Sequence, residues 1–338
     1  MTLPLQKAKA PKKKMHKNKL FLGIDTSNYT TSVSLCNFDG EIVLNLKKLL
    51  PVADGERGLR QSDALFAHTK NLPIIMEELS EFLDSNYPER DISAIGFSKT
   101  PRDAEGSYMP CFLSGVAVAS SLSSTLGCPS YYFSHQSGHV MAALYSAGRL
   151  DLLEKTERFA AFHVSGGTTE LLLITPNGGG FSVELIGETA DINAGQAIDR
   201  TGVIMGMSFP CGREMESLIC DADIPKQKTK ISVKGLICNL SGLENQTKKM
   251  YEETGDKALV SAYCFDFVAD TLSKMTENLR EIYADIPIIY AGGVMSNKRI
   301  GSQLAKYENT YFSAPEFSSD NAAGIALLCR KSFLAKGE

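Results

Sequence analysis

The sequence contains one long pattern twice. The first copy, LFLGIDTSNYTTSVSLCNFDGEIVLNL, begins at residue 20 and predicts three short strands joined by a small polar turn and an Asp-Gly turn. The second copy, FAAFHVSGGTTELLLITPNGGGFSVELI, begins at residue 159 and again has a Thr-Thr pair near the start of its second strand. A β-meander repeated within one chain favours two similar lobes, although two unrelated α/β domains would also produce it.

Helical patterns that alternate with short apolar runs follow each copy. The runs AIGFS and IPIIYAGG are typical of buried parallel strands. Two lobes that each open with a hairpin and a small polar turn are typical of the actin, hexokinase and sugar-kinase superfamily, whose turns hold the phosphates of a nucleotide from both sides. We therefore expect this two-lobed α/β fold, with helices over 63–82, 111–125, 136–147, 193–206, 257–283, 296–306 and 320–335.

Charge is unevenly distributed along the chain. Residues 1–19 hold seven lysines and no acidic residue, while the other 28 basic residues face 39 acidic ones. Such a basic segment is typical of a disordered solubilising tail or of an electrostatic arm for nucleic acid. We divide the chain into this tail, a first lobe at 20–130 that is completed by the C-terminal helix 320–335, and a second lobe at 131–319.

The cysteines and the hydropathy pattern indicate a cytoplasmic protein. The eight cysteines are scattered, and no pair has the spacing of a zinc knuckle or of a redox motif. We expect no signal peptide before them. Because a membrane span needs about 20 apolar residues in a row and the chain has no such run, we expect no membrane association.

Two histidines stand four residues apart in the segment SHQSGHV. In a helix, His135 and His139 would lie on one face, where both imidazoles can reach one metal ion. The alternative is that His135 caps the helix and His139 packs as a buried polar residue. Metallopeptidases of the H-E-x-x-H type have a glutamate base after the first histidine, but this chain has Gln136, which cannot take up a proton. The pair therefore suits a metal that acts as a Lewis acid rather than peptide hydrolysis.

Seven segments, in order, resemble the tRNA-adenosine threonylcarbamoyltransferase family, formerly described as glycoprotein endopeptidases. The resemblance extends over residues 20–335 and supports the two-lobed fold. The matching segments are GIDTS (23–27), SHQSGH (134–139), HVSGGTTEL (163–171), GETADINAGQAIDRTGVIMG (187–206), NLSGL (239–243), AGGVMSNKRI (291–300) and SSDNAAGIA (318–326).

The resemblance implies a metal site and a nucleotide site. Its metal ligands fall on His135, His139 and Asp320, which would hold one divalent ion, iron or zinc. Its ribose-binding aspartate falls on Asp199. The remaining nucleotide contacts fall on His163, Val164, Ser165, Gly166 and Gly167 in the adenylate-binding turn, on Gly212 beside the nucleotide, and on Asn297 as a polar contact.

The resemblance also implies a reaction and its partners. In the family, a partner enzyme makes threonylcarbamoyl-adenylate, and this type of protein passes the threonylcarbamoyl group to the exocyclic amine of the adenosine beside the tRNA anticodon. The expected partners are therefore the adenylate substrate, tRNA and the other proteins of a threonylcarbamoylation complex. An exocyclic adenine nitrogen is a poor nucleophile, so positioning and charge stabilisation must supply most of the acceleration.

Several segments depart from the family pattern. The first turn, usually Ser-Cys-Asp-Glu-Thr, reads SNYTT from Ser27 and lacks both acids, and the charged TPRDAEGSYMP at 100–110 replaces a glycine-rich turn. Thr168, Gln196 and Cys211 replace a histidine, a glutamate and a glycine. These changes leave two alternatives open: a related carbamoyl or acyl transferase that acts on another amine, or a nucleotide- and metal-binding partner protein.

Overall fold

The computed structural model describes residues 18–27, 29–51, 59–220 and 224–337. These residues form two compact units, one up to Gly138 and from Asn321 onward, and the other from His139 to Asp320. Most of the predicted basic tail, and Asn28 in the SNYTT turn, lie outside the described residues. Strand β1 begins at Lys19, the last residue of the predicted basic tail.

The first unit contains a five-stranded sheet in the order β3-β2-β1-β4-β5. The first three strands pair antiparallel, as the meander pattern predicts, and β4 and β5 continue the sheet in parallel. The strands are β1 (Lys19–Thr26), β2 (Thr30–Asn37), β3 (Ile42–Leu49), β4 (Asp91–Thr100) and β5 (Ser130–Ser134).

The second unit repeats this topology in a seven-stranded sheet, β12-β11-β6-β7-β8-β10-β9. A meander is again followed by two parallel strands, and two short strands extend the outer edge. The duplicated meander and the α/β fold class are confirmed. The strands are β6 (Phe159–Val164), β7 (Thr169–Asn177), β8 (Gly180–Thr189), β9 (Ser232–Lys234), β10 (Ile237–Asn239), β11 (Ile288–Ala291) and β12 (Thr310–Phe312).

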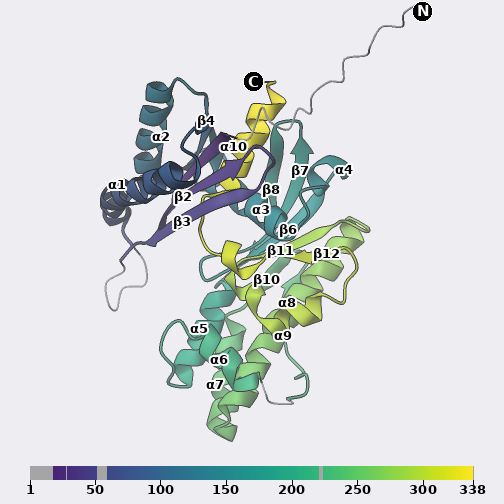
Figure 1. The fold of residues 1–338 in the computed structure, drawn as a ribbon. Coiled ribbons are helices and arrows are strands. Elements are labelled where there is room, and N and C mark those ends of the chain that lie inside the picture. The colour runs from purple at the N-terminus through teal and green to yellow at the C-terminus, as the bar shows by residue number, and fades with distance from the viewer. Residues whose placement is uncertain (1–17, 28, 52–58, 221–223, 338) are drawn as a thin grey trace, which may run out of the picture. The chain divides into compact units, whose positions relative to one another are not determined.

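Helices cover both faces of the first sheet (Figure 1). Alternate residues of β1 face opposite sides, so Leu22 and Ile24 pack with α1 and α2, whereas Phe21 and Gly23 meet α10. Helix α10 begins at Ala323 rather than at 320, and just before it Asn321 Oδ1 accepts a hydrogen bond of 3.1 Å from the Ala323 amide in a local side-chain turn. These helices are α1 (Gln61–Asn86), α2 (Phe112–Leu126) and α10 (Ala323–Ala335), and α3 (His135–Ser146) continues into the second unit.

Helix α8 forms the centre of the second unit, and most of its side chains are buried. Helices α6 and α7, which were not expected from the sequence, pack against it. Across the described part of the chain, no helix has both the length and the apolar character needed to cross a bilayer. The helices of this unit are α4 (Leu152–Lys155), α5 (Ala194–Ile204), α6 (Gly212–Ile219), α7 (Gly242–Thr254), α8 (Lys257–Ile282) and α9 (Lys298–Leu304), with short 3₁₀ turns η2 (Gly293–Ser296) and η3 (Pro315–Phe317).

A glycine allows α10 to lie directly on β1. A Cβ atom added at Gly23 would lie 2.5 Å from the backbone nitrogen of Ala326 and 2.6 Å from the Ala322 carbonyl oxygen. Both atoms belong to backbone, so neither can move without shifting the helix. The close packing of α10 on the sheet therefore requires glycine at this position.

We predict that Gly23→Ala lowers the free energy of unfolding by about 1–3 kcal/mol, the usual cost of overpacking a tight interior. Urea unfolding measures the change. Gly178→Ala is the matched control, because a Cβ atom there meets nothing within 4 Å, and it should change the value by less than about 0.5 kcal/mol. Equal unfolding midpoints for the two variants would show that α10 can shift to accommodate the added methyl group at little cost in stability.

Candidate metal and nucleotide site

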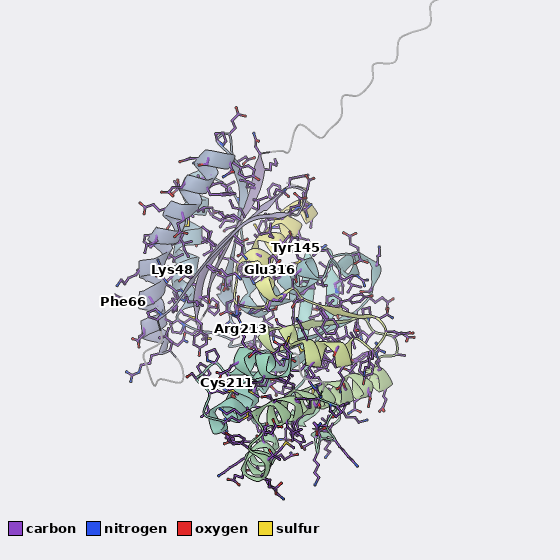
Figure 2. The ribbon with its side chains drawn as sticks, turned by 60° about the horizontal axis from the view of Figure 1, so that its bottom comes forward. Lys48, Phe66, Tyr145, Cys211, Arg213 and Glu316 are labelled. Carbon is purple, nitrogen blue, oxygen red and sulfur yellow. The ribbon has the colours of Figure 1, made fainter. Side chains whose placement is uncertain are left out.

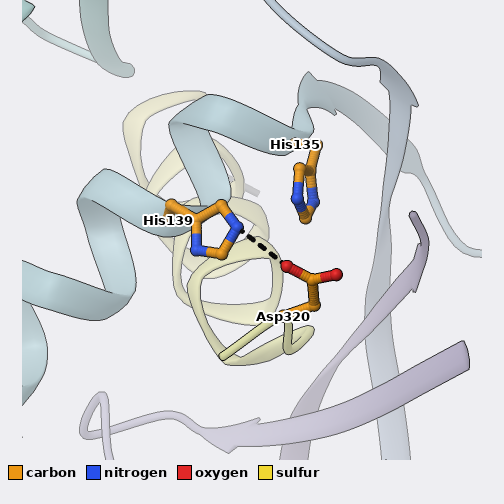
Figure 3. Close-up of side chains that lie close together, drawn as sticks. All are labelled: His135, His139 and Asp320. Atoms are coloured by element: carbon orange, nitrogen blue, oxygen red, sulfur yellow. Dashed lines mark ion pairs between the residues drawn. The ribbon is translucent and has the colours of Figure 1, made fainter. Parts of the chain in front are cut away.

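Two histidines and one aspartate come together at helix α3 (Figure 3). His135 and His139 are one turn apart on this continuous helix, so the helix itself sets their spacing. Asp320 lies beside His139 within the second unit, with 3.3 Å between Asp320 Oδ1 and His139 Nε2. One ligand atom from each side chain lies within 4.8 Å of those of the other two. The three residues that the resemblance implies as ligands are therefore neighbours.

The chemistry and spacing of this group fit a divalent transition metal. Two ligands bound at about 2.0–2.2 Å in a tetrahedral site are separated by roughly 3.3–3.6 Å, which agrees with the distance between His139 and Asp320. Two imidazoles and one carboxylate form a donor set that suits zinc or iron(II). Three protein ligands leave coordination positions open, as catalytic metal sites require.

A buried aspartate fixes the orientation of the first histidine. Asp25 Oδ1 lies 3.0 Å from His135 Nδ1, and the Asp25 side chain is inaccessible to solvent. An ionised Asp25 can only accept this hydrogen bond; in that state Nδ1 donates and Nε2 is the nitrogen left to face a metal. Asp25 stands within the quoted GIDTS segment, but no sequence pattern predicts this contact with His135.

The loop at 100–110 holds the first turn of α3. Ser137 Oγ donates a hydrogen bond of 2.5 Å to Asp103 Oδ2 and accepts one of 3.0 Å from Ser134 Oγ. The Gln136 amide donates to the carbonyl oxygen of Pro101 at 3.0 Å. This loop departs from the family pattern, yet it is tied directly to the turn between the two histidines.

A buried histidine closes the other divergent segment, the SNYTT turn. His68 Nε2 lies 2.7 Å from the Ser27 carbonyl oxygen, and His68 Nδ1 lies 2.8 Å from Thr31 Oγ1. The carbonyl can only accept, so Nε2 donates and Nδ1 accepts from the threonine hydroxyl. Burial lowers the pKa of His68, which favours this neutral form. The turn that lacks both family acids is therefore held by neutral hydrogen bonds.

The predicted adenylate-binding turn connects β6 and β7. Helix α5 begins against it: the Gly195 amide donates to the Ser165 carbonyl oxygen at 3.1 Å, and the Ala194 amide donates to Thr169 Oγ1 at 2.8 Å. Gly166 and Gly167, at the tip of the turn, are exposed. Turns beside a helix N-terminus commonly hold a phosphate through backbone N–H groups. In this turn the Ser165 amide donates to the Thr168 carbonyl oxygen at 2.7 Å and the Gly167 amide donates to Ser165 Oγ at 3.2 Å.

Asp199 and Gly212 meet where α5 and α6 approach each other. Asp199 Oδ1 accepts a hydrogen bond of 2.8 Å from the Cys211 amide, and Gly212 is the first residue of α6. Burial raises the pKa of Asp199 above its ordinary value, while this hydrogen bond acts in the opposite direction. Asp199 therefore already serves a structural contact in addition to its predicted contact with ribose.

Cys211, which replaces a family glycine, is accommodated by a glycine on α5. Figure 2 marks Cys211 and, close to it, Arg213 at the start of α6. A Cβ atom added at Gly202 would lie 2.2 Å from Cys211 Cβ, so the larger residue fits only because position 202 has no side chain. The substitution therefore leaves the α5–α6 contact intact.

His163 and Asn297 are placed differently from the rest of the predicted nucleotide contacts. Phe162 and Val164 face the helix-covered core, so His163 points to the other face of the sheet, where its ring lies 4.6 Å from that of His139. Asn297 is buried at the start of α9, and its Oδ1 accepts a hydrogen bond from the Ile300 amide at 3.1 Å. The structure thus places His163 beside His139, one of the predicted metal ligands, and gives Asn297 a helix-capping contact.

Asp191 organises the NLSGL segment and was missed by the sequence analysis. Its carboxylate accepts hydrogen bonds from the Leu240 amide at 2.8 Å and from Ser241 Oγ at 2.6 Å. Partial burial would raise the pKa of Asp191, but these hydrogen bonds and one from the Ile192 amide hold it well below the usual range. Its ionised side chain joins the start of α5 to the start of α7.

A family model described as tRNA N6-adenosine threonylcarbamoyltransferase (TsaD) matches residues 52–327. The chain belongs to this family. A protein of that name from Christiangramia forsetii is 28% identical over 333 residues, which cover 93% of each chain. A protein of the same name from Bacillus licheniformis is 29% identical over 333 residues, covering 92% of this chain and 91% of the relative.

Among solved structures, full-length HypF in a phosphate- and nucleotide-bound form has a similar fold, with a TM-score of 0.60. The match covers 96% of this chain and 56% of HypF. At 12% identity it supports the fold alone. The resemblance to the family is confirmed by the family model, and the match to HypF agrees with the expected α/β fold class.

We predict that His139→Ala abolishes stable binding of a divalent ion, because it removes one of three ligands. Protein loaded with Zn²⁺ or Fe²⁺ and freed of excess ion is analysed by mass spectrometry for metal content. Asp25→Asn should weaken metal affinity by about 10–100-fold, the usual effect of losing the partner that orients a ligand.

Asp84→Asn, which alters an exposed ion pair with Arg90, is the control for this measurement and should keep the wild-type metal content. Equal metal content in the wild-type protein and in the His139→Ala variant would contradict the assignment of the ligands.

Proposed function

We propose that this protein transfers a threonylcarbamoyl group from threonylcarbamoyl-adenylate to the exocyclic amine of the adenosine beside the anticodon of tRNA. Membership of the family supports the reaction. The observation that carries the proposal for this chain is the group formed by His135, His139 and Asp320, because the ligands that the activity requires are retained despite the divergence around them.

The proposed reaction is an acyl transfer. The amine nitrogen forms a bond to the carbamoyl carbon, the bond from that carbon to the phosphate oxygen breaks, and the amine proton and AMP are released. A divalent ion held by the three ligands would polarise the carbamoyl carbonyl. The turn at 164–167 would hold the phosphate through its amides, and Asp199 would accept hydrogen bonds from the ribose hydroxyls.

The expected location and partners follow from this activity. We propose a cytoplasmic enzyme that receives its adenylate from a partner protein and acts on tRNA. The two units would serve as the lobes expected at 20–130 with 320–335, and at 131–319. Gln136 in place of a glutamate base supports acyl transfer rather than peptide hydrolysis.

Analysis of tRNA nucleosides tests the proposal. Cells that lack this protein should lose N6-threonylcarbamoyladenosine, and the wild-type gene should restore it, whereas the His139→Ala variant should not. Mass spectrometry of digested tRNA is the measurement. An unchanged nucleoside profile in the deletion strain would exclude tRNA modification as the main activity, provided that no second family member is present in that strain.

A second candidate is a related acyltransferase with a small amine as its acceptor. The observation in its favour is the segment at 100–110, which replaces a glycine-rich family turn and binds to the first turn of α3 through Asp103. A different segment beside the first turn of α3 would alter which acceptor molecules can approach His135. Transfer to a small amine together with an unchanged tRNA profile would favour this candidate.

Asp199→Ala should weaken binding of AMP by about 1.5–3 kcal/mol, the value of hydrogen bonds to a charged group. Asp199→Asn separates two roles, since its amide oxygen can still accept from the Cys211 amide while the charge is lost. Glu184→Gln, an exposed change on β8, is the control. Calorimetry with AMP is the measurement, and unchanged affinity in Asp199→Ala would place the nucleotide elsewhere.

A further inference from the structure

A segment of the second unit presents lysines on one side only. From residue 226 to residue 234, exposed and partly buried residues alternate without exception. The exposed positions include Lys226, Lys228, Lys230 and Lys234, and no acidic residue occurs between 224 and 243. This alternation is typical of an extended chain, in which successive side chains point to opposite sides. The segment ends in β9, the edge strand of the sheet.

The inner side of the segment is anchored to helix α8. The Gln227 amide donates a hydrogen bond of 2.7 Å to Asp266 Oδ2, and Thr229 Oγ1 donates one of 2.5 Å to Asp270 Oδ2. Further along, Val233 packs against the hydrophobic core. These contacts hold the inner residues at every second position, so the outward direction of the lysines is set before any partner binds.

An arginine from α9 completes this anchor. Arg299 forms two hydrogen bonds with the buried carboxylate of Asp266, at 2.7 and 2.8 Å, and donates a third to the Ile224 carbonyl oxygen at 3.0 Å. A buried bidentate pair of this kind holds both partners in a defined geometry. The start of the segment is thereby tied to two helices.

Three of the four lysines form no ion pair with a carboxylate in the described part of the chain. Lys226 forms an ion pair of 2.7 Å with Asp270, which partly neutralises it. Within the described ranges, no carboxylate pairs with Lys228, Lys230 or Lys234, which we call the lysine row. Alternate residues of an extended chain are about 6.6–6.8 Å apart. The row is therefore a preorganised line of positive charge on a chain with an excess of acidic residues.

We propose that the lysine row binds the phosphate backbone of the RNA acceptor. This inference rests on the proposed function and extends it, since it names a surface through which the tRNA would be held. Ammonium groups that contact phosphates position a nucleic acid without reading its sequence, so the row would contribute affinity and orientation rather than choice of base. Neutralised phosphates release counterions, which makes such binding depend on salt.

The test compares the full-length wild-type chain with the triple variant Lys228→Gln, Lys230→Gln, Lys234→Gln. Binding of unmodified tRNA is measured at several salt concentrations between 50 and 200 mM. Each lost phosphate contact lowers the slope of log affinity against log salt by about 0.7 on single-stranded RNA, so the triple variant should lose about two units of slope. Binding of AMP and of metal should not change.

A second triple variant is the charge-matched control. Lys155→Gln, Lys257→Gln, Lys306→Gln removes three exposed lysines of the same unit outside the row, and it should keep the wild-type slope within about one unit. Equal slopes for the wild-type protein and the row variant would overturn the inference and leave the proposed function standing.

Two other outcomes would also decide against the row. Lysines near an edge strand can protect it from pairing with another chain. If the row variant self-associates in sedimentation but binds tRNA like the wild type, the lysines guard the edge and the inference is wrong. If the wild-type protein binds no tRNA at 50 mM salt, the proposal that tRNA is the acceptor is wrong, and the proposed role of the lysine row is wrong with it.

Discussion

The arrangement of the candidate site depends on helix α3, which runs without interruption through the boundary between the two units. Its pitch sets the spacing of His135 and His139, and its first turn is held from the first unit by Asp25 and Asp103. Asp320 reaches His139 from within the second unit. A metal bound by all three residues would therefore join the helix to the segment that precedes α10.

The segments that depart from the family pattern are built into the structure by specific contacts. His68 closes the SNYTT turn, Asp103 ties the charged loop to α3, and Gly202 makes room for Cys211. In each case a neighbouring residue supplies the hydrogen bond or the space that the new residue needs. The divergence thus changes the surroundings of the three predicted metal ligands while it leaves those residues and the framework in place.

Basic and acidic residues are unevenly distributed in this protein. The chain beyond residue 19 has an excess of acidic residues, which disfavours broad binding to nucleic acid. Positive charge is instead concentrated in the amino-terminal lysines and in the lysine row. Because the row is anchored by Asp266 and Asp270, two of the acidic residues serve to hold a basic surface in place. The proposed role of the row therefore rests on local order rather than on net charge.

The sequence by itself determined the duplicated meanders, most of the long helices, the histidine pair and the family, because these depend on local periodicity and on short ordered motifs. Only the tertiary structure decided the partners Asp25 and Asp103, the place of His163 beside His139, and the outward direction of the lysine row. The physical reason is that these contacts join segments far apart in the chain. The hydrogen bond between Asp25 and His135 leaves no trace in either segment. The lysines at every second position from 226 to 230 are visible in the sequence, but only packing against α8 and the core decides which side of the segment is covered.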